Sequence, residues 1–258
     1  MNSRIRSLFW QRILAFDCAL LVLLCPARAA GPETTKAYAS NGELDYIGDL
    51  DDAANQRLFD LYETLSPKPR VLSIRSEGGE VNAGMSLGAW VRDHRLDVKV
   101  LEYCLSSCAN YVFPAGIRKI VSNVAVIGYH GGPNNPGKLA LGAEAREVYN
   151  ALSPAKRKAF MDDIAATSLR DSRRESDYFR RIGVRADISS LGQQPEYARF
   201  AAANPGTAGW TYSLEGFALL GVRDISVIDP PWKPGSTSRH PVFVTIPVKA
   251  RAAGTRPR

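Results

Sequence analysis

The sequence predicts an α/β fold with a largely parallel β-sheet. Short apolar segments rich in β-branched residues alternate with longer segments whose apolar residues recur every three or four positions. This alternation is typical of strand–helix units that build a parallel sheet. The chain has 258 residues, and the roughly 230 that follow a predicted leader suit one domain with a sizeable core.

The first predicted unit is a strand at residues 44–50 followed by a helix. Asp51 or Asp52 is expected to cap this helix, because a carboxylate accepts hydrogen bonds from the free amides of a first turn. Pro67 and Pro69 end the helix. Its expected buried face consists of Ala54, Leu58, Leu61, Tyr62 and Leu65.

The second unit begins with a short buried strand at residues 71–74, which ends in the turn Glu77-Gly78-Gly79. The helix after this turn ends in charged residues 92–95. Its inward side chains are expected to be Val81, Met85, Ala89 and Trp90.

The next two units contain the most informative segments of the chain. A strand at residues 98–101 leads into EYCLSSCANYVF (residues 102–113), which places two hydroxyls and two thiols where a strand turns into a helix at about residue 107. Two strand-like pieces within residues 120–127 then lead to His130 in the segment VIGYHGG. Active residues at the carboxyl ends of strands are what this architecture predicts.

The second half of the chain is predicted to be mainly helical. Residues 144–168 form a helix broken or bent near Pro154, and a charged helix continues to Gly183. Residues 217–227 close the domain with a short helix, a cap at Gly221 and a strand. Residues 230–258 are rich in proline and basic residues, and we expect them to form a mostly disordered tail.

Residues 1–29 have the features of a secretory signal peptide. Arginines precede an apolar stretch, and Ala27-Arg28-Ala29 fits a cleavage site. We therefore expect a periplasmic or otherwise exported protein. The alternative is an uncleaved N-terminal anchor that associates the protein with a membrane, although the apolar stretch is shorter than the roughly 20 residues that a span needs.

Composition argues against several classes of partner. Cleavage after Ala29 removes four arginines and one aspartate, so the net charge falls from +7 to +4. No cluster of basic residues is interleaved with aromatic ones, so we expect no nucleic-acid partner. One histidine and two clustered thiols lack the paired spacing of a zinc site, so no metal or other cofactor is expected.

Cys104 and Cys108 are the two cysteines that remain after cleavage. On one helix their Cα atoms would lie about 6 Å apart, which is within disulfide range. One interpretation is a bridge that straddles Ser107 and rigidifies or gates a site. The other is a pair of small side chains buried under the turn.

Ser107 and His130 are the candidate catalytic residues. A serine nucleophile needs a base and backbone donors for the oxyanion, and Ser107 lies at a predicted helix N-terminus. The alternatives are a serine that only caps the helix and a histidine satisfied by backbone at a strand end. Ser106 is a weaker candidate nucleophile, and the other histidines, His94 and His240, lie in a charged helix end and in the tail.

Gly78 and Gly79 would let a substrate strand approach and would supply one oxyanion amide, while the amide of Cys108 would supply the other. The simpler interpretation of the two glycines is a tight turn that requires positive φ. Both interpretations can hold at once.

Taken together, these segments resemble the ClpP/crotonase superfamily, specifically its ClpP-like serine peptidases and the related signal peptide peptidase A group. Residues 74–85, IRSEGGEVNAGM, are similar to the family's INSPGGxVxAGM turn and helix. Residues 107–116, SCANYVFPAG, align without a gap with SMGAFLLxAG, whose serine is the nucleophile. His130 falls where the family keeps its base, and residues 212–224, YSLEGFALLGVRD, are similar to the closing LSAxEAxxYGLVD.

The resemblance covers roughly residues 42–132 and 212–228 and implies a spiral of β-β-α units within residues 30–229. It also implies a helical insertion at about residues 138–205, added C-terminal helices and self-association into a homo-oligomer. The family places its triad aspartate just before the closing motif, but residues 205–212 contain no acid. The insertion contains Asp162, Asp163 and Asp177, none of which the sequence places beside His130.

The sequence thus predicts an exported ClpP-like serine hydrolase, in the first instance a peptidase acting on a peptide or protein. The alternative is a pseudoenzyme that keeps the fold as a peptide-binding or assembly module in the cell envelope, which the missing acid favours. Acyl-CoA chemistry of the crotonase type is disfavoured, because CoA is a cytosolic cofactor and no basic phosphate cradle is visible in the sequence.

Overall fold

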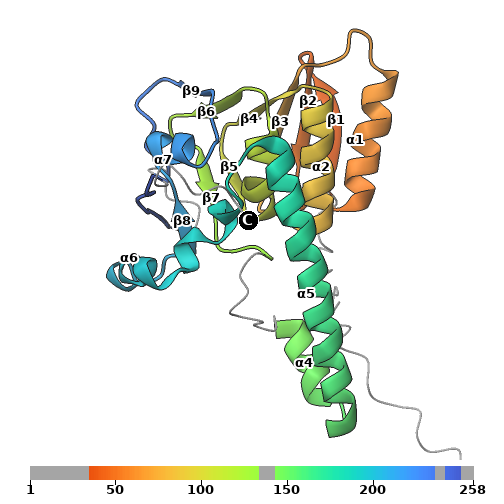
Figure 1. Cartoon of the computed structure of the whole chain (residues 1–258). Helices are drawn as coiled ribbons and strands as arrows, with labels where there is room; N and C mark the ends of the chain where they lie inside the picture. The colour runs from red at the N-terminus through yellow and green to blue at the C-terminus, as the bar shows by residue number, and fades with distance from the viewer. Residues whose placement is uncertain (1–34, 134–142, 236–241, 251–258) are drawn as a thin grey trace, which may run out of the picture. The chain divides into compact units, whose positions relative to one another are not determined.

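The computed structural model describes residues 35–133, 143–235 and 242–250 (Figure 1). A six-stranded sheet with the order β1-β2-β3-β4-β6-β9 forms the centre of these residues. β1 and β2 are antiparallel, and every other neighbouring pair is parallel. The predicted α/β class with a mostly parallel sheet is therefore confirmed. The strands of this sheet are β1 (Lys36–Ser40), β2 (Glu43–Ile47), β3 (Val71–Arg75), β4 (Asp97–Val100), β6 (Lys119–Ser122) and β9 (Ile225–Ile228).

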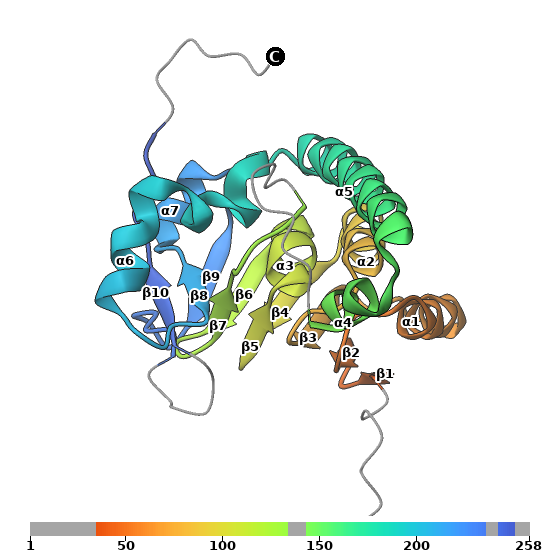
Figure 2. The same ribbon diagram turned by 90° about the horizontal axis from the view of Figure 1, so that it is seen from below.

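Shorter strands form a second set beside the large sheet (Figure 2). β5 (Tyr103–Leu105) pairs in parallel with β7 (Val126–Gly128), and β8 (Gly209–Thr211) pairs with β10 (Phe243–Thr245). Isolated bridges extend this set from Ser76 to Cys104 and from Tyr129 to Trp210. The chain therefore passes repeatedly through a strand of the large sheet, then a short strand or bridge of the second set, and then a helix.

Three helices, α1 (Asp52–Thr64), α2 (Val81–Asp93) and α5 (Pro154–Ile182), follow one another along one side of the sheet (Figure 2). α1 begins where the sequence predicts, because the Asp51 carboxylate accepts a hydrogen bond from the amide of Ala54 at 2.7 Å. The predicted break near Pro154 separates α4 (Ala143–Ala151) from α5, since proline fits the first turn of a helix but not its interior.

The remaining helical elements are short. The single helix expected at residues 107–113 is a π-helix, η1 (Cys108–Val112), followed by α3 (Phe113–Ala115). Within the described residues no helix is long and apolar enough to cross a membrane, and the predicted leader lies outside them. The other short elements are η2 (Ala186–Ser189), η3 (Leu191–Gln193), η4 (Pro195–Tyr197), α6 (Ala198–Ala203) and α7 (Leu214–Leu219).

The end of α2 has an unusual residue at a position that favours glycine. The amide of Arg95 donates to the carbonyl of Arg92 at 3.2 Å, and the amide of Leu96 donates to the carbonyl of Val91 at 3.0 Å. These two bonds define a Schellman motif, whose first residue beyond the cap adopts a left-handed conformation. Here that residue is Arg95, with φ of +55°.

The C-terminal segment differs from the disordered tail that we expected at residues 230–258. β10 pairs with β8, and Ile246 is buried with its amide bonded to the carbonyl of Thr211 at 3.0 Å. The indole of Trp232 donates to the carbonyl of Ala125 at 2.9 Å. A few apolar side chains thus anchor a segment whose average composition is that of a tail. Residues 236–241 and 251–258 lie outside the described residues.

Candidate functional site

The serine turn and the histidine segment begin at the same edge of the short β5–β7 pair. Leu105 of β5 lies opposite Gly128 of β7, and the amide of Ser106 donates to the carbonyl of Gly128 at 2.9 Å. Because the two strands are parallel, the residues that follow them emerge side by side. Ser107 and His130 therefore follow the neighbouring ends of β5 and β7, although β6 lies between these two strands in the sequence.

Ser107 is buried, with 3% of its surface exposed, and its hydroxyl donates to the carbonyl of Gly79 at 2.9 Å. Its side chain makes no capping hydrogen bond to the helix. Ser107 is therefore the N-cap residue of η1 by position, but it does not make the side-chain hydrogen bond that the capping interpretation requires. The contact joins the serine turn directly to the Gly78–Gly79 turn.

Ser106 is half-buried and has φ of +52°. A non-glycine residue in the left-handed region stores backbone strain, and such residues concentrate at functional turns. A sharp, strained turn from strand to helix is also how α/β hydrolases present a nucleophilic serine. The geometry therefore keeps Ser106 beside Ser107 as a candidate nucleophile.

Gly78 and Gly79 both have positive φ, of +111° and +142°. The interpretation of the two glycines as a tight turn that requires positive φ is therefore confirmed at both positions. A Cβ at Gly78 would lie 2.6 Å from Cβ of Ser106 and 3.0 Å from the amide nitrogen of Ser107. A Cβ at Gly79 would overlap with the carbonyl oxygen of Leu50. Glycine at position 78 is therefore required for the glycine turn to pack against the serine turn, and glycine at position 79 for its close approach to the backbone of Leu50.

The predicted oxyanion donors have free backbone amides in the part of the chain that the structure describes. The amides of Gly79 and Cys108 donate no hydrogen bond to another backbone group there. Cys108 begins η1, and the first amides of a helix have no partner within the helix. Both donors are thus available to a developing negative charge.

His130 is exposed and lines a cavity of about 180 Å³. Its ring makes no hydrogen bond to either serine, to an acid or to backbone among the described residues, while its carbonyl accepts a bond from the Gln193 side chain at 3.1 Å. The structure therefore brings the backbone of the two candidates together without joining their side chains. The other lining residues are Gly192, Tyr197, Phe200, Thr207, Ala208, Gly209, Trp210, Val244 and Ile246.

Sequence reasoning missed a buried polar network beneath the loop that follows His130. The Asn110 amide donates to the carbonyl of Gly131 at 2.9 Å. The fully buried Glu175 of α5 accepts a bond from the Tyr111 hydroxyl at 2.8 Å, and a Cβ at Gly132 would lie 2.7 Å from its carboxylate oxygen. Burial and the neighbouring Glu175 raise the pKa of Tyr111 well above its usual value.

A signal for Glu175 exists in the sequence. It lies three, four and seven residues before Tyr178, Phe179 and Ile182, which form the buried face of α5. An acid in register with such an apolar face is expected to be buried and paired. By contrast, Asp162, Asp163 and Asp177 are exposed.

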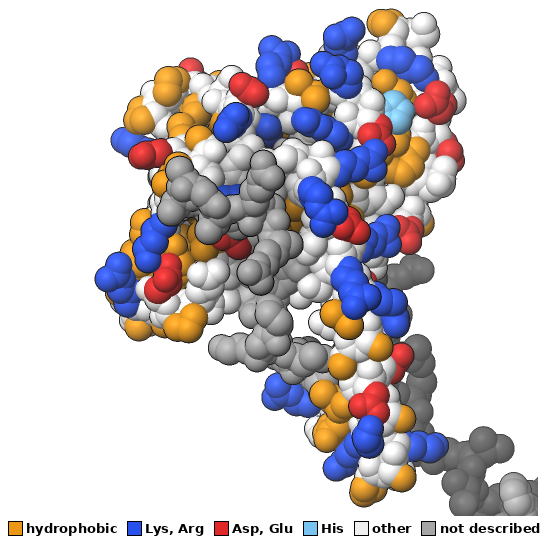
Figure 3. Space-filling view, viewed as in Figure 1, with side chains coloured by type: hydrophobic (Ala, Val, Ile, Leu, Met, Phe, Trp, Pro, Cys, Tyr) orange, Lys and Arg blue, Asp and Glu red, His pale blue; other side chains and the backbone are white. Residues whose placement is uncertain are grey.

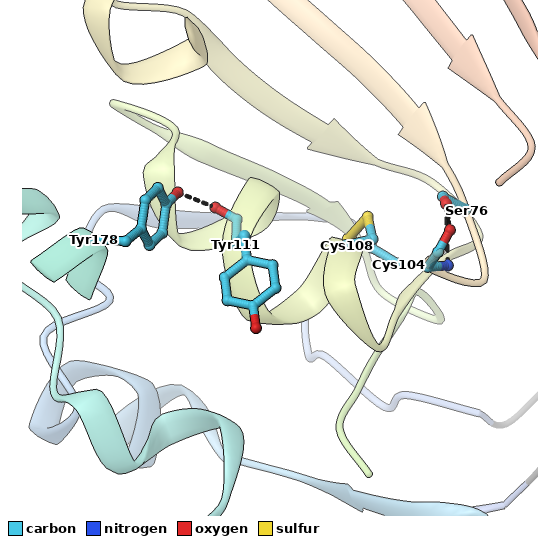
Figure 4. Close-up of a disulfide and its surroundings, with 6 residues drawn as sticks. Ser76, Cys104, Cys108, Tyr111 and Tyr178 are labelled. Carbon is cyan, nitrogen blue, oxygen red and sulfur yellow. Dashed lines mark hydrogen bonds between the residues drawn. A yellow bond between two sulfur atoms is a disulfide. The ribbon is translucent and has the colours of Figure 1, made fainter. Parts of the chain in front are cut away.

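A disulfide joins Cys104 of β5 to Cys108 of η1, with the Cα atoms 5.2 Å apart (Figure 4). It spans Ser106 and Ser107 and ties the strand to the helix on both sides of the turn. Of the two interpretations of these cysteines, the structure has the bridge. Among the described residues no group of three or more His, Cys, Asp or Glu is placed to hold a metal ion.

We expect residues 30–258 of the oxidised protein to contain no free thiol, since Cys104 and Cys108 are the only cysteines in that segment. The measurement is a thiol count on denatured protein, before and after reduction. A count of two without reductant would contradict the bridge.

The comparisons with known proteins add no relative. No protein-family model matches the chain, and no curated protein is significantly similar to it. The function is therefore inferred from the geometry of the site and from the motifs in the sequence.

Proposed function

We propose that the chain is an exported ClpP-like serine hydrolase, and in the first instance a peptidase. The repeated passage from the large sheet to a short strand and then to a helix supports the ClpP/crotonase spiral that the motifs imply. The signal-peptide features in the sequence of residues 1–29 support export, and self-association is carried over from the resemblance.

The pairing of β5 with β7 is the observation that carries this proposal. It places the start of the serine turn beside the start of the histidine segment, and the bond from Ser107 to Gly79 joins the serine turn to the glycine turn. These are the nucleophile, the base and the oxyanion donors that acyl transfer needs. The strained backbone at Ser106 is consistent with a turn shaped for chemistry.

In the proposed mechanism, the Ser107 hydroxyl attacks a substrate carbonyl, and His130 takes its proton and returns it to the leaving group. The amides of Gly79 and Cys108 stabilise the oxyanion, and each such donor contributes about 10²–10³ in rate. For this step the Ser107 hydroxyl must turn away from the Gly79 carbonyl. The His130 ring must turn toward the Ser107 hydroxyl. Substrate binding in the cavity beside His130 would supply the second movement.

That cavity also suits a particular substrate side chain. Its walls include the rings of Tyr197, Phe200 and Trp210, and its volume of about 180 Å³ is similar to that of an apolar cavity of about 150 Å³ that binds benzene. An aromatic or large aliphatic side chain next to the scissile bond would fill it.

A specific observation favours the second candidate function, a peptide-binding or assembly module without catalysis. The Ser107 hydroxyl is already occupied by the Gly79 carbonyl, and among the described residues no acid contacts the His130 ring. A ClpP-like fold that keeps only its binding groove would have this arrangement.

Labelling with a fluorophosphonate probe tests the proposal. Wild-type residues 30–258 should be labelled, Ser107→Ala should lose the label, and Ser106→Ala should keep it. Loss of the label in Ser106→Ala alone would move the nucleophile to Ser106. Absence of label on folded wild-type protein, with a competent trypsin control in the same reaction, would favour the binding module.

A further inference from the structure

A second cleft, of about 640 Å³, lies at the edge of the large sheet away from the serine turn. Its walls come from three loops that lead into parallel strands, namely residues 67–70 before β3, 94–97 before β4 and 117–118 before β6. The glycine turn and the serine turn follow β3 and β5 instead. Because loops before and after parallel strands lie at opposite edges of a sheet, the cleft is separate from the candidate active site.

Positive charge dominates the lining of this cleft. Lys68, Arg70, Arg95 and Arg118 line it, and Asp97 is the only acid among the described lining residues. Figure 3 shows Lys and Arg side chains gathered over this upper end of the molecule. His94 also lines the cleft, with its Nδ1 2.9 Å from the carbonyl of Trp90.

Two of these cations have no compensating acid. The Asp97 carboxylate already binds Arg118, with contacts of 2.9 and 2.6 Å to the guanidinium. The Lys68 ammonium nitrogen lies 3.1 Å from a carboxylate oxygen of Glu63. Arg70 and Arg95 are exposed and make no ion pair or side-chain hydrogen bond within the described ranges. Their guanidinium groups remain available to an external anion.

The backbone at Arg95 is an independent reason to assign a role to its side chain. Arg95 occupies the left-handed position of the Schellman motif at the end of α2, where glycine avoids the steric cost that a side chain incurs. Arg95 is exposed, and its side chain makes no hydrogen bond or ion pair within the described ranges. A strained residue whose charged side chain has no partner in the protein is a candidate for function.

We propose that this cleft binds a multiply charged phosphate group through Arg70 and Arg95. Planar guanidinium groups present paired donors that match phosphate oxygens, and two uncompensated cations favour an anion with more than one charge. The volume is that of a small-molecule site rather than of a single ion. The group belongs either to a soluble phosphorylated molecule or to a phospholipid headgroup.

No sequence pattern indicates this site, because its cations are spread over 51 residues from Lys68 to Arg118 and only the sheet brings the three loops together. The proposal does not depend on hydrolase activity. A phosphate bound here would not support acyl-CoA chemistry at the serine turn, since the cleft and that turn lie at opposite edges of the sheet.

Calorimetric titration of residues 30–258 with inorganic pyrophosphate, at fixed ionic strength, tests the proposal. We expect saturable binding that weakens at least tenfold in the double variant Arg70→Gln/Arg95→Gly. The control is Arg173→Gln, which removes an exposed arginine of α5 far along the chain from the cleft and should bind as wild type does. Arg95→Gly relieves the left-handed strain, so the double variant should melt at or above the wild-type temperature, and a loss of binding cannot then be attributed to unfolding.

A second arm identifies the source of the phosphate. The same proteins are sedimented with phosphatidylcholine vesicles that contain phosphatidylglycerol or phosphatidic acid. Binding to pyrophosphate alone assigns a soluble ligand, and binding to anionic vesicles that the double variant loses assigns a headgroup. No binding in either arm, or binding that the double variant retains in full, would overturn the proposal.

Discussion

Replacing His130 by alanine should slow fluorophosphonate labelling by about 10²–10⁴-fold, because the serine would lose the general base that activates it. The same change should leave the free energy of unfolding within about 0.5 kcal/mol of wild type, since the exposed ring makes no hydrogen bond among the described residues. The measurements are the second-order labelling rate and a urea unfolding curve on the same preparation.

His94→Ala is the matched control. The His94 ring lies 4.5 Å from the Trp90 ring and 5.1 Å from the Tyr62 ring, and its Nδ1 contacts the carbonyl of Trp90. That variant should therefore lose about 1–2 kcal/mol of stability while labelling at the wild-type rate. If His130→Ala unfolds readily and still labels normally, His130 is a structural residue and the base lies elsewhere.

Local sequence patterns predict much of the fold. The cap at Asp51, the break at Pro154 and the end of α5 at Gly183 are confirmed, because each depends on the chemistry of a few neighbouring residues. The alternation of strands and helices likewise indicated the parallel sheet. The family spiral and the hydrolase activity remain predictions.

Features that depend on distant residues were not predictable in this way. The hydrogen bond between Tyr111 and Glu175 joins residues 64 positions apart. The position of β10 likewise depends on its pairing with β8. The C-terminal segment has the composition of a tail, and its few apolar anchors do not change that average. A hydrophobic pattern indicates the buried face of one element. The contacts described above depend on which elements pack against each other.

Ser107 shows the same limit within the candidate site. Its position at the start of a helix predicts a cap, but its hydroxyl donates to Gly79, which precedes it by 28 positions. The strain at Ser106 is also invisible in the sequence, since serine is not a residue that signals positive φ. The local pattern singles out this segment as a candidate, but it does not determine which of the two hydroxyls would be presented to a substrate.

Gly88→Ala should destabilise the protein by about 3 kcal/mol, although helix propensity alone predicts a gain of about 1 kcal/mol. A Cβ at Gly88 would overlap with the Tyr178 hydroxyl and lie 2.5 Å from the carbonyl oxygen of Tyr111. These two groups form the buried 2.6 Å hydrogen bond that joins α5 to η1 (Figure 4). Overpacking and the loss of that bond each cost about 1–3 kcal/mol, so together they outweigh the gain in propensity.

A double-mutant cycle with Tyr178→Phe separates the clash from other effects of the alanine, and the measurement is chemical denaturation of all four proteins. Tyr178→Phe removes the hydroxyl that the new methyl group meets, so Gly88→Ala should cost about 1 kcal/mol less on that background. Ser86→Ala, in the same helix, should change stability by no more than about 0.5 kcal/mol. A Gly88→Ala variant as stable as wild type would mean that α5 does not pack against η1 as described, and the buried Glu175 would then lose its place beneath the His130 loop.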